Sequence, residues 1–111
     1  CIHNFLNISS AVPCVNPNIF NPIFATSDFL AMGCYQALRD HNLNIPKDVS
    51  IIGFDNSETA ENLKPGLTSI HLPIPEMTAK ALQHVFDNKK YDENFKVYVD
   101  CDIIKRSSAQ L

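Results

Sequence analysis

The stretch VSIIGFDN, residues 49–56, decides the fold class of this chain. It begins as an apolar run without polar alternation, which is typical of a strand buried on both faces of a sheet. After Gly53 and Phe54 it changes abruptly to an acid and an amide. A strand that only has to end needs a turn, whereas an aspartate at the mouth of a strand can also hold a ligand. Asp55 is therefore the first candidate binding residue.

The segments before this strand complete a β-α-β unit. Residues 23–26 form another short apolar run, and residues 29–41 between the two runs are rich in helix formers. Ser27 and Asp28 precede this helix as N-cap residues do, and Asn42 follows it as a left-handed cap does. Such a unit places its strands parallel through a right-handed crossover. The sequence therefore predicts an α/β fold with a parallel sheet.

The remaining elements are predicted from the same kinds of pattern. In chain order they are a helix end and irregular loop over 1–21, a short helix over 57–63, a strand over 67–72, a helix over 75–88 and a closing strand over 95–104. Pro75 suits the first turn of its helix, which carries one apolar stripe.

Composition limits what the chain does on its own. Of its 111 residues, 45% are hydrophobic and 19% charged, which suits one domain or a piece of one. No apolar run reaches the ~18 residues of a membrane span. The formal net charge is −3, whereas domains that bind nucleic acid through phosphates are usually basic. Because the first residue is not Met, we expect a piece of a longer protein.

Catalytic and metal motifs are not recognised in the sequence. The cysteines at positions 1, 14, 34 and 101 have no paired spacing, so we interpret them as free thiols in a reducing cytosol. The histidines are scattered, and Cys1 with His3 is only a lone pair of possible ligands, so neither a metal nor a cofactor is expected. Without a nucleophile motif or a Gly-rich phosphate loop, an enzyme is a weaker hypothesis than a binding protein.

Polar residues at the ends of the two strands indicate where a ligand would bind. Ligands of open parallel sheets bind outside the carboxyl ends of the strands. The first strand ends at Ser27 and Asp28, and the second ends at Asp55 and Asn56, so the four side chains should share one rim. The alternative is structural, because these residue types also cap helices and form turns. That alternative is stronger for Asp28 than for Asp55.

The helix over residues 29–41 is apolar on two sides. One stripe would pack on the sheet and consists of Leu30, Cys34, Ala37 and Leu38. Met32 and Tyr35 project to a different side, given the 100° step per residue. A second apolar side needs a second partner, either another layer of the same fold or another subunit.

Several motifs occur in order along the chain: SDFLAMG at 27–33, IPKDVS at 45–50, GFDN at 53–56, PGLTSI at 65–70 and DIIKRSS at 102–108. Together they resemble the effector-binding core of the lactose repressor/galactose repressor (LacI/GalR) family of bacterial transcription regulators. The resemblance covers about residues 22–108. It implies a periplasmic-binding-protein-like type I fold, in which two α/β lobes joined by three crossovers hold a small molecule between them.

The resemblance also implies how the chain is divided. Residues 1–67 would be the end of the C-terminal effector-binding lobe, residues 68–95 a crossover strand and helix of the N-terminal lobe, and residues 96–111 the return strand. The rest of the first lobe and the DNA-reading headpiece would lie outside this chain. The implied partners are a small-molecule effector, a second copy in a homodimer, and operator DNA contacted only through the missing headpiece, all in the cytoplasm.

The expected ligand-binding residues follow from the same resemblance. Asp55 matches the aspartate that hydrogen-bonds ligand hydroxyls or ring nitrogens. Asp28 and Phe54 are further candidates because of their positions at the strand ends, not because of the resemblance. Ser27 stands where many sugar-binding relatives have Asn, and Leu72 where many have Gln. A carboxamide offers both a donor and an acceptor, so these two departures weaken the usual clamp on a polyhydroxyl ligand.

Met32, Tyr35 and Leu63 match positions at the subunit interface of relatives, which favours a dimer. The leading hypothesis is therefore the effector-binding and dimerisation region of a LacI-type regulator, in which an effector closes the lobes and changes operator affinity. The alternative is a periplasmic-type sugar-binding protein of a transport system, which shares the Gly-Phe-Asp segment. A signal peptide or a helix-turn-helix at the start of the parent gene would distinguish them.

Overall fold

The computed structural model describes residues 22–87 and 96–110. The elements in chain order are β1 (Pro22–Phe24), α2 (Asp28–Asp40), β2 (Ser50–Asp55), α3 (Glu58–Asn62), β3 (Thr68–His71), α4 (Ile74–Phe86) and β4 (Asp102–Ile104). The helix end and loop predicted over residues 1–21 lie outside the described residues. The other predicted elements are present. Their observed bounds differ from the predicted ones by a few residues, and the difference is larger only for the closing strand.

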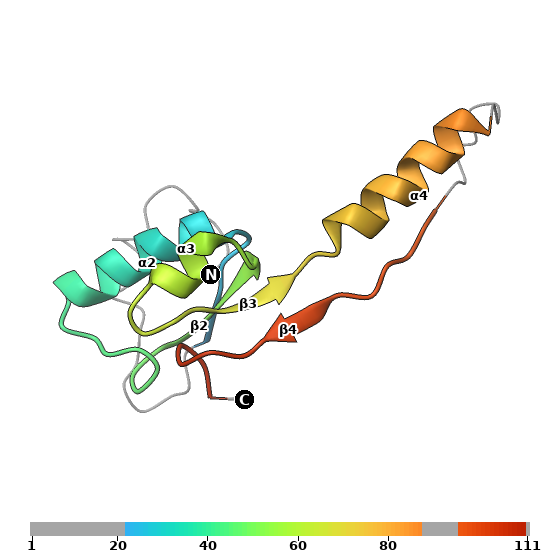
Figure 1. Cartoon of the computed structure of the whole chain (residues 1–111). Helices are drawn as coiled ribbons and strands as arrows, with labels where there is room; N and C mark the ends of the chain where they lie inside the picture. Colours follow the sequence, from blue (N-terminus) through green and yellow to red (C-terminus); the bar gives the residue numbers. More distant parts are fainter. Residues whose placement is uncertain (1–21, 88–95, 111) are drawn as a thin grey trace.

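The sheet is mostly parallel. Its order is β1-β2-β3-β4, with β1–β2 and β2–β3 paired in parallel and β3–β4 antiparallel. In this register Ile23 lies beside Ile51, and Asp55 lies beside His71. Figure 1 shows α2 and α3 together on one side of the sheet. The predicted α/β class is confirmed, and the carboxyl ends of β1, β2 and β3 point to one edge.

Helix α2 begins and ends close to where the sequence predicts. The Ser27 side-chain oxygen accepts a hydrogen bond from the backbone N–H of Leu30 at 3.2 Å, which caps the first turn. At the other end Asn42 adopts φ 57°, a left-handed conformation that asparagine tolerates. The buried apolar side of the helix consists of Ala31, Cys34, Tyr35, Ala37 and Leu38. These residues form the core with Val49, Ile51 and Leu67, and the helix packs against β2.

Tyr35 belongs to that core, so of the two partners left open for its side of the helix the structure shows the intramolecular one. The side chain is 3% exposed, and its hydroxyl donates a hydrogen bond to the carbonyl of Pro65 at 2.9 Å. Burial raises the pKa of Tyr35 to about 12. The loop at Pro65 covers this side of the helix, so only Met32 of the pair, 43% exposed, lies on the outer surface.

The segment after β4 returns to the sheet at Ser108, which is fully buried. The Ser108 hydroxyl donates to the carbonyl of Ile51 and accepts from the backbone N–H of Thr68 at 2.8 Å. The backbone N–H of Ile51 in turn donates to the Ser108 carbonyl at 2.8 Å. The end of the DIIKRSS motif therefore ties the beginnings of β2 and β3 together.

The closing strand is shorter than expected. Only Asp102–Ile104 is a strand, and residues 96–101 have no regular structure. The reason is that β3 ends at His71, so the chain before Asp102 has no neighbouring strand to pair with. In Figure 1 these residues run alongside α4 instead.

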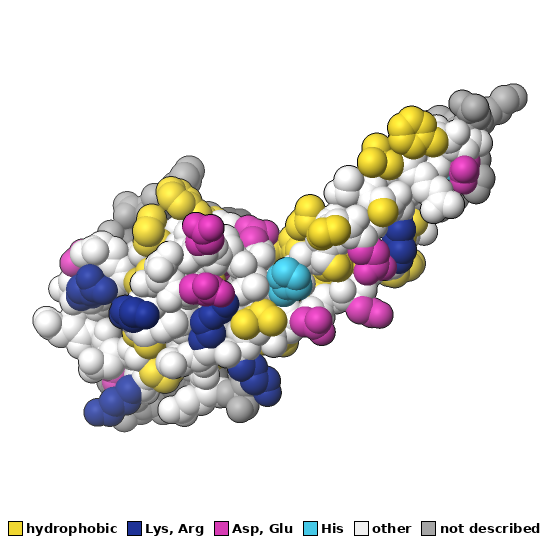
Figure 2. Space-filling view, viewed as in Figure 1, with side chains coloured by type: hydrophobic (Ala, Val, Ile, Leu, Met, Phe, Trp, Pro, Cys, Tyr) yellow, Lys and Arg dark blue, Asp and Glu magenta, His cyan; other side chains and the backbone are white. Residues whose placement is uncertain are grey.

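Helix α4 projects away from the sheet, and none of its 13 residues is buried. Figure 1 shows it beyond the end of β3, and Figure 2 shows apolar side chains along its surface. The large apolar residues exposed on this helix are Ile74, Met77, Leu82, Val85 and Phe86. Its apolar stripe, predicted from the sequence, is therefore present without a covering layer among the described residues.

Candidate ligand-binding site

The candidate site is the rim formed by the carboxyl ends of the parallel strands. Asp55 is the last residue of β2, and it pairs in register with His71, the last residue of β3. Leu72 follows β3 directly, and Ser27 follows β1 by three residues. Asp55 is exposed, so its carboxylate is available to a solute. The parallel register thus brings the predicted strand-end residues to one edge.

The backbone at the end of β2 has an unusual conformation. Asp55 adopts φ 101° and Asn56 adopts φ 51°, and glycine occupies neither position. Positive φ is uncommon for residues other than glycine, although Asp and Asn are enriched among them. Such conformations persist only where the surrounding structure holds them, and they cluster at ligand sites. The local geometry therefore turns the chain sharply just where Asp55 reaches the rim.

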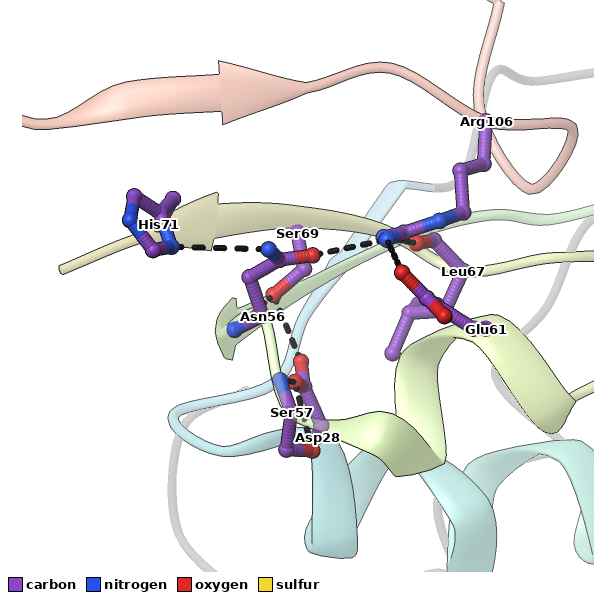
Figure 3. Close-up of polar contacts among 8 residues, drawn as sticks. All are labelled: Asp28, Asn56, Ser57, Glu61, Leu67, Ser69, His71 and Arg106. Carbon is purple, nitrogen blue, oxygen red and sulfur yellow. Dashed lines mark hydrogen bonds and ion pairs between the residues drawn. The ribbon is translucent and has the colours of Figure 1, made fainter.

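Asn56 is held at three of its atoms (Figure 3). Its backbone N–H donates to Ser69 Oγ at 3.0 Å, and its side-chain oxygen accepts from Arg106 Nη2 at 2.8 Å. The amide nitrogen lies 3.4 Å from Nδ1 of His71. Asn56 was predicted to lie at the rim, but neither Arg106 nor His71 was. Arg106 reaches it from 50 positions further along the chain.

Asp28 lies beneath this turn and not in the open rim. Its carboxylate, 1% exposed, accepts hydrogen bonds from Ser69 Oγ at 2.6 Å and from the backbone N–H and hydroxyl of Ser57 at 2.7 and 2.9 Å. These contacts join the start of α2 to the start of α3 and to β3. Together with the cap at Ser27, they give both predicted rim residues structural roles in the described protein.

Phe54 and Leu72 supply apolar surface near the rim. The Phe54 ring packs edge to face on Phe24, with ring centroids 6.4 Å apart. Phe24 is 51% exposed, and Phe54 and Leu72 are half-buried. Leu72 offers no hydrogen-bonding group, so polar contacts at this edge come from Asp55, Asn56 and His71.

Met32 and Leu63, two of the three residues expected at a subunit interface, contribute to the same hollow in the surface. They line a shallow hollow between α2 and α3, whose other lining residues are Glu58, Thr59 and Asn62. Leu63 is half-buried at the end of α3. Tyr35, the third residue of the predicted interface set, lies inside the lobe.

The described part of the chain contains neither a metal cluster nor a membrane span. In residues 22–87 and 96–110, no group of three or more His, Cys, Asp or Glu side chains is placed to hold a metal ion. No helix in those ranges is both long and apolar enough to cross a membrane. Cys34 and Cys101 are free thiols. Burial raises the pKa of the Cys34 thiol, which makes it a poor nucleophile.

Comparison with known families identifies the fold. Residues 6–109 match the family described as periplasmic binding protein-like domain. The chain belongs to this family. Because the matched residues include β1 to β4 and all three described helices, the periplasmic-binding-protein-like fold predicted from the sequence motifs is confirmed.

The relatives within this family are transcriptional regulators. The chain is 33% identical to the HTH-type transcriptional regulator MalR of Clostridium butyricum over 78% of its own length, and 37% identical to the ribose operon repressor of Haemophilus influenzae over 69%. It spans only 26% and 24% of those two proteins, about a quarter of each. The predicted resemblance to the LacI/GalR family is confirmed for this region.

A solved structure supports the same assignment. The LacI family transcriptional regulator from Enterococcus faecium with bound ribose is 32% identical, with a TM-score of 0.68. The match covers 94% of this chain and 38% of that one. The chain therefore corresponds to well under half of that relative.

Proposed function

We propose that this chain is the effector-binding and dimerisation region of a bacterial LacI-type transcriptional regulator. It binds a small molecule, a sugar or a related metabolite, and the parent protein binds operator DNA through a headpiece outside this chain. The observation that carries this proposal is the exposed carboxylate of Asp55, held at φ 101° at the end of the central parallel strand. A family relative holds ribose, which is consistent with a polyhydroxyl ligand.

The polar groups of the rim suit such a ligand. A carboxylate accepts hydrogen bonds from neighbouring hydroxyls, and the strong acceptor character of Asp55 favours a ligand rich in donors. Ser27 is committed to capping α2, and Leu72 offers no donor or acceptor. The effector therefore receives fewer polar contacts from this lobe than a fully amide-lined rim would give. The remaining contacts come from the opposing lobe.

In our proposal, the opposing lobe also accounts for the exposed position of α4. Helix α4 belongs to the N-terminal lobe, whereas β3 pairs with β2 in the sheet of the C-terminal lobe, to which the segment after β4 returns. The apolar stripe of α4, with Phe86 75% exposed, is covered there by parent-protein residues outside this chain. We propose that the parent protein is a cytoplasmic regulator whose effector closes the two lobes and shifts a two-state equilibrium.

Ligand screening of the full-length parent protein tests the proposal. D-ribose, D-glucose and other sugars are added separately, and the melting temperature is recorded for each. One sugar is expected to raise the stability by about 2.7 kcal/mol at a concentration 100 times its dissociation constant. The same sugar is expected to change operator binding in a gel-shift assay. A panel without any stabilising sugar or related metabolite would contradict the proposal, whereas stabilisation without DNA binding would favour a transport-type binding protein.

Dimerisation is predicted to use the surface at Met32 and Leu63. Met32→Glu places a charge in an apolar contact, and we expect it to weaken the parent dimer about tenfold or more. Sedimentation equilibrium measures the dimer dissociation constant. Met32→Leu, which keeps the apolar character and volume, is the matched control and should dimerise normally. An unaltered dimer in Met32→Glu would place the interface elsewhere.

A further inference from the structure

Asn56 lies at the rim and is itself held by intramolecular hydrogen bonds. It adopts φ 51° directly after Asp55 at φ 101°. Two consecutive non-glycine residues with positive φ carry a conformational cost, so their neighbours must hold them. The backbone N–H of Asn56 is held by Ser69 Oγ, which itself donates to the buried carboxylate of Asp28. This anchor fixes the turn from below.

Arg106 fixes the same turn from the other side. Its side chain is 16% exposed, and Nη2 donates to the Asn56 side-chain oxygen while Nη1 donates to the carbonyl of Leu67, both at 2.8 Å. Its main chain is also fixed, because the Arg106 N–H donates to Thr68 Oγ1 at 2.9 Å and the threonine hydroxyl donates back to the Arg106 carbonyl. Figure 3 shows the guanidinium between Leu67 and Asn56. A planar fork of donors suits such two-point contacts.

We propose that Arg106 and Asn56 form a positioning pair that holds Asp55 in its ligand-binding conformation. Arg106 donates to Asn56, and Asn56 holds the left-handed turn that directs Asp55 to the rim. The inference rests on the proposed ligand-binding function of Asp55. Arg106 follows β4 on the segment that returns to this lobe, so a shift of that segment reaches Asp55 through a single side-chain hydrogen bond.

Amide hydrogen exchange in the unliganded full-length parent protein tests the pair without any ligand. Arg106→Met keeps the aliphatic stem that packs beside Gly66 but removes the donors. We expect exchange in residues 55–57 to accelerate about tenfold, the equivalent of one lost hydrogen bond. Residues 51–52 in the middle of β2 should keep their protection. A purely structural role of Arg106 would instead accelerate exchange throughout the strand.

Substitutions at Asn56 give an independent measurement. Asn56→Gly keeps the left-handed backbone but loses the oxygen that Arg106 contacts, so it should also accelerate exchange in residues 55–57. Asn56→Asp keeps that oxygen, with a charge that strengthens the contact, and should restore protection. Glu61→Gln is the matched control, because Glu61 makes only an exposed ion pair with Arg106 at 3.3 Å.

Calorimetric titration with D-ribose supplies the functional readout. Arg106→Met and Asn56→Gly are each expected to weaken D-ribose binding about five- to tenfold, while Glu61→Gln should bind like the wild type. Unchanged exchange in both Arg106→Met and Asn56→Gly would contradict the proposed positioning role. Accelerated exchange together with unchanged D-ribose affinity would contradict it as well. If the wild type does not bind D-ribose, D-ribose is not the effector, and the exchange data alone decide whether the pair holds the turn.

Discussion

Asp28→Ala is expected to destabilise the parent protein by about 4 kcal/mol. The buried carboxylate accepts three hydrogen bonds, each worth about 1.5–3 kcal/mol, and their contributions do not add fully because they share one acceptor group. Removal of the carboxylate leaves the N–H of Ser57 and the hydroxyl of Ser69 without their acceptor. It also removes a negative charge from the first turn of α2, where it interacts favourably with the helix dipole. The midpoint of urea denaturation measures the loss.

Asp40→Ala is the matched control for this substitution. Asp40 ends the same helix, is exposed, and only accepts a hydrogen bond from Gln36 at its surface. We expect its replacement to change stability by no more than about 0.5 kcal/mol. Equal effects of the two substitutions would show that the buried network under the rim does not stabilise the lobe.

Gly53 gives a second test of the same network. An added Cβ at this position would overlap a carboxylate oxygen of Asp28 and lie 2.7 Å from Leu67 Cδ2. Gly53→Ala should therefore cost about 2 kcal/mol, as overpacking of a filled core does. In the Asp28→Ala background part of the overlap disappears. The double variant should therefore lose less stability than the sum of the losses in the two single variants. Fully additive costs would mean that Gly53 is crowded by Leu67 alone.

The elements around this network were predictable because their signals are local. The apolar run of residues 49–54 with no polar alternation indicates a buried parallel strand, and its bounds lie within one residue of β2. Ser27 precedes α2 as an N-cap, and Asn42 follows it with positive φ. Each signal depends on neighbours within a few residues, which is the range over which capping and periodicity act.

Tyr35 shows where such local signals fail. The helical step correctly places Tyr35 and Met32 away from the stripe that meets the sheet, but it does not specify what else covers the helix. The cover is the loop at Pro65, 30 positions away, whose carbonyl accepts the tyrosine hydroxyl. A helix with two apolar sides has two partners, and for Tyr35 the second partner is intramolecular.

Only part of the candidate site could be predicted, because it too depends on contacts between residues that are distant in the sequence. Asp55 follows from the end of a strand, but the residues that hold its conformation come from β3 and from the segment after β4. Arg106 lies 50 positions from Asn56, so no spacing rule connects them. The DIIKRSS motif contains Arg106 and marks the segment, but it does not reveal that the guanidinium turns toward the rim.

Asp55→Gly is expected to weaken effector binding about 10- to 100-fold, since a hydrogen bond to a charged group is worth about 1.5–3 kcal/mol. Glycine adopts φ 101° without strain, so the turn and the fold should be kept. Calorimetric titration of the full-length parent protein with D-ribose, or with the sugar that the screen identifies, measures the affinity. Asn42→Gly is the matched control, because it removes an exposed polar side chain at φ 57° on the far end of α2.

The choice of substitution at Asp55 separates the carboxylate from the backbone. Alanine at φ 101° is strained by about 1–3 kcal/mol, so Asp55→Ala combines a lost contact with a disturbed turn. Asp55→Asn keeps an acceptor oxygen but loses the charge, which contributes about half of such a hydrogen bond. A direct contact between carboxylate and effector therefore predicts the affinity order Asp, then Asn, then Gly. If Gly instead binds as tightly as Asp and only Ala is weak, the turn matters and the carboxylate does not touch the effector.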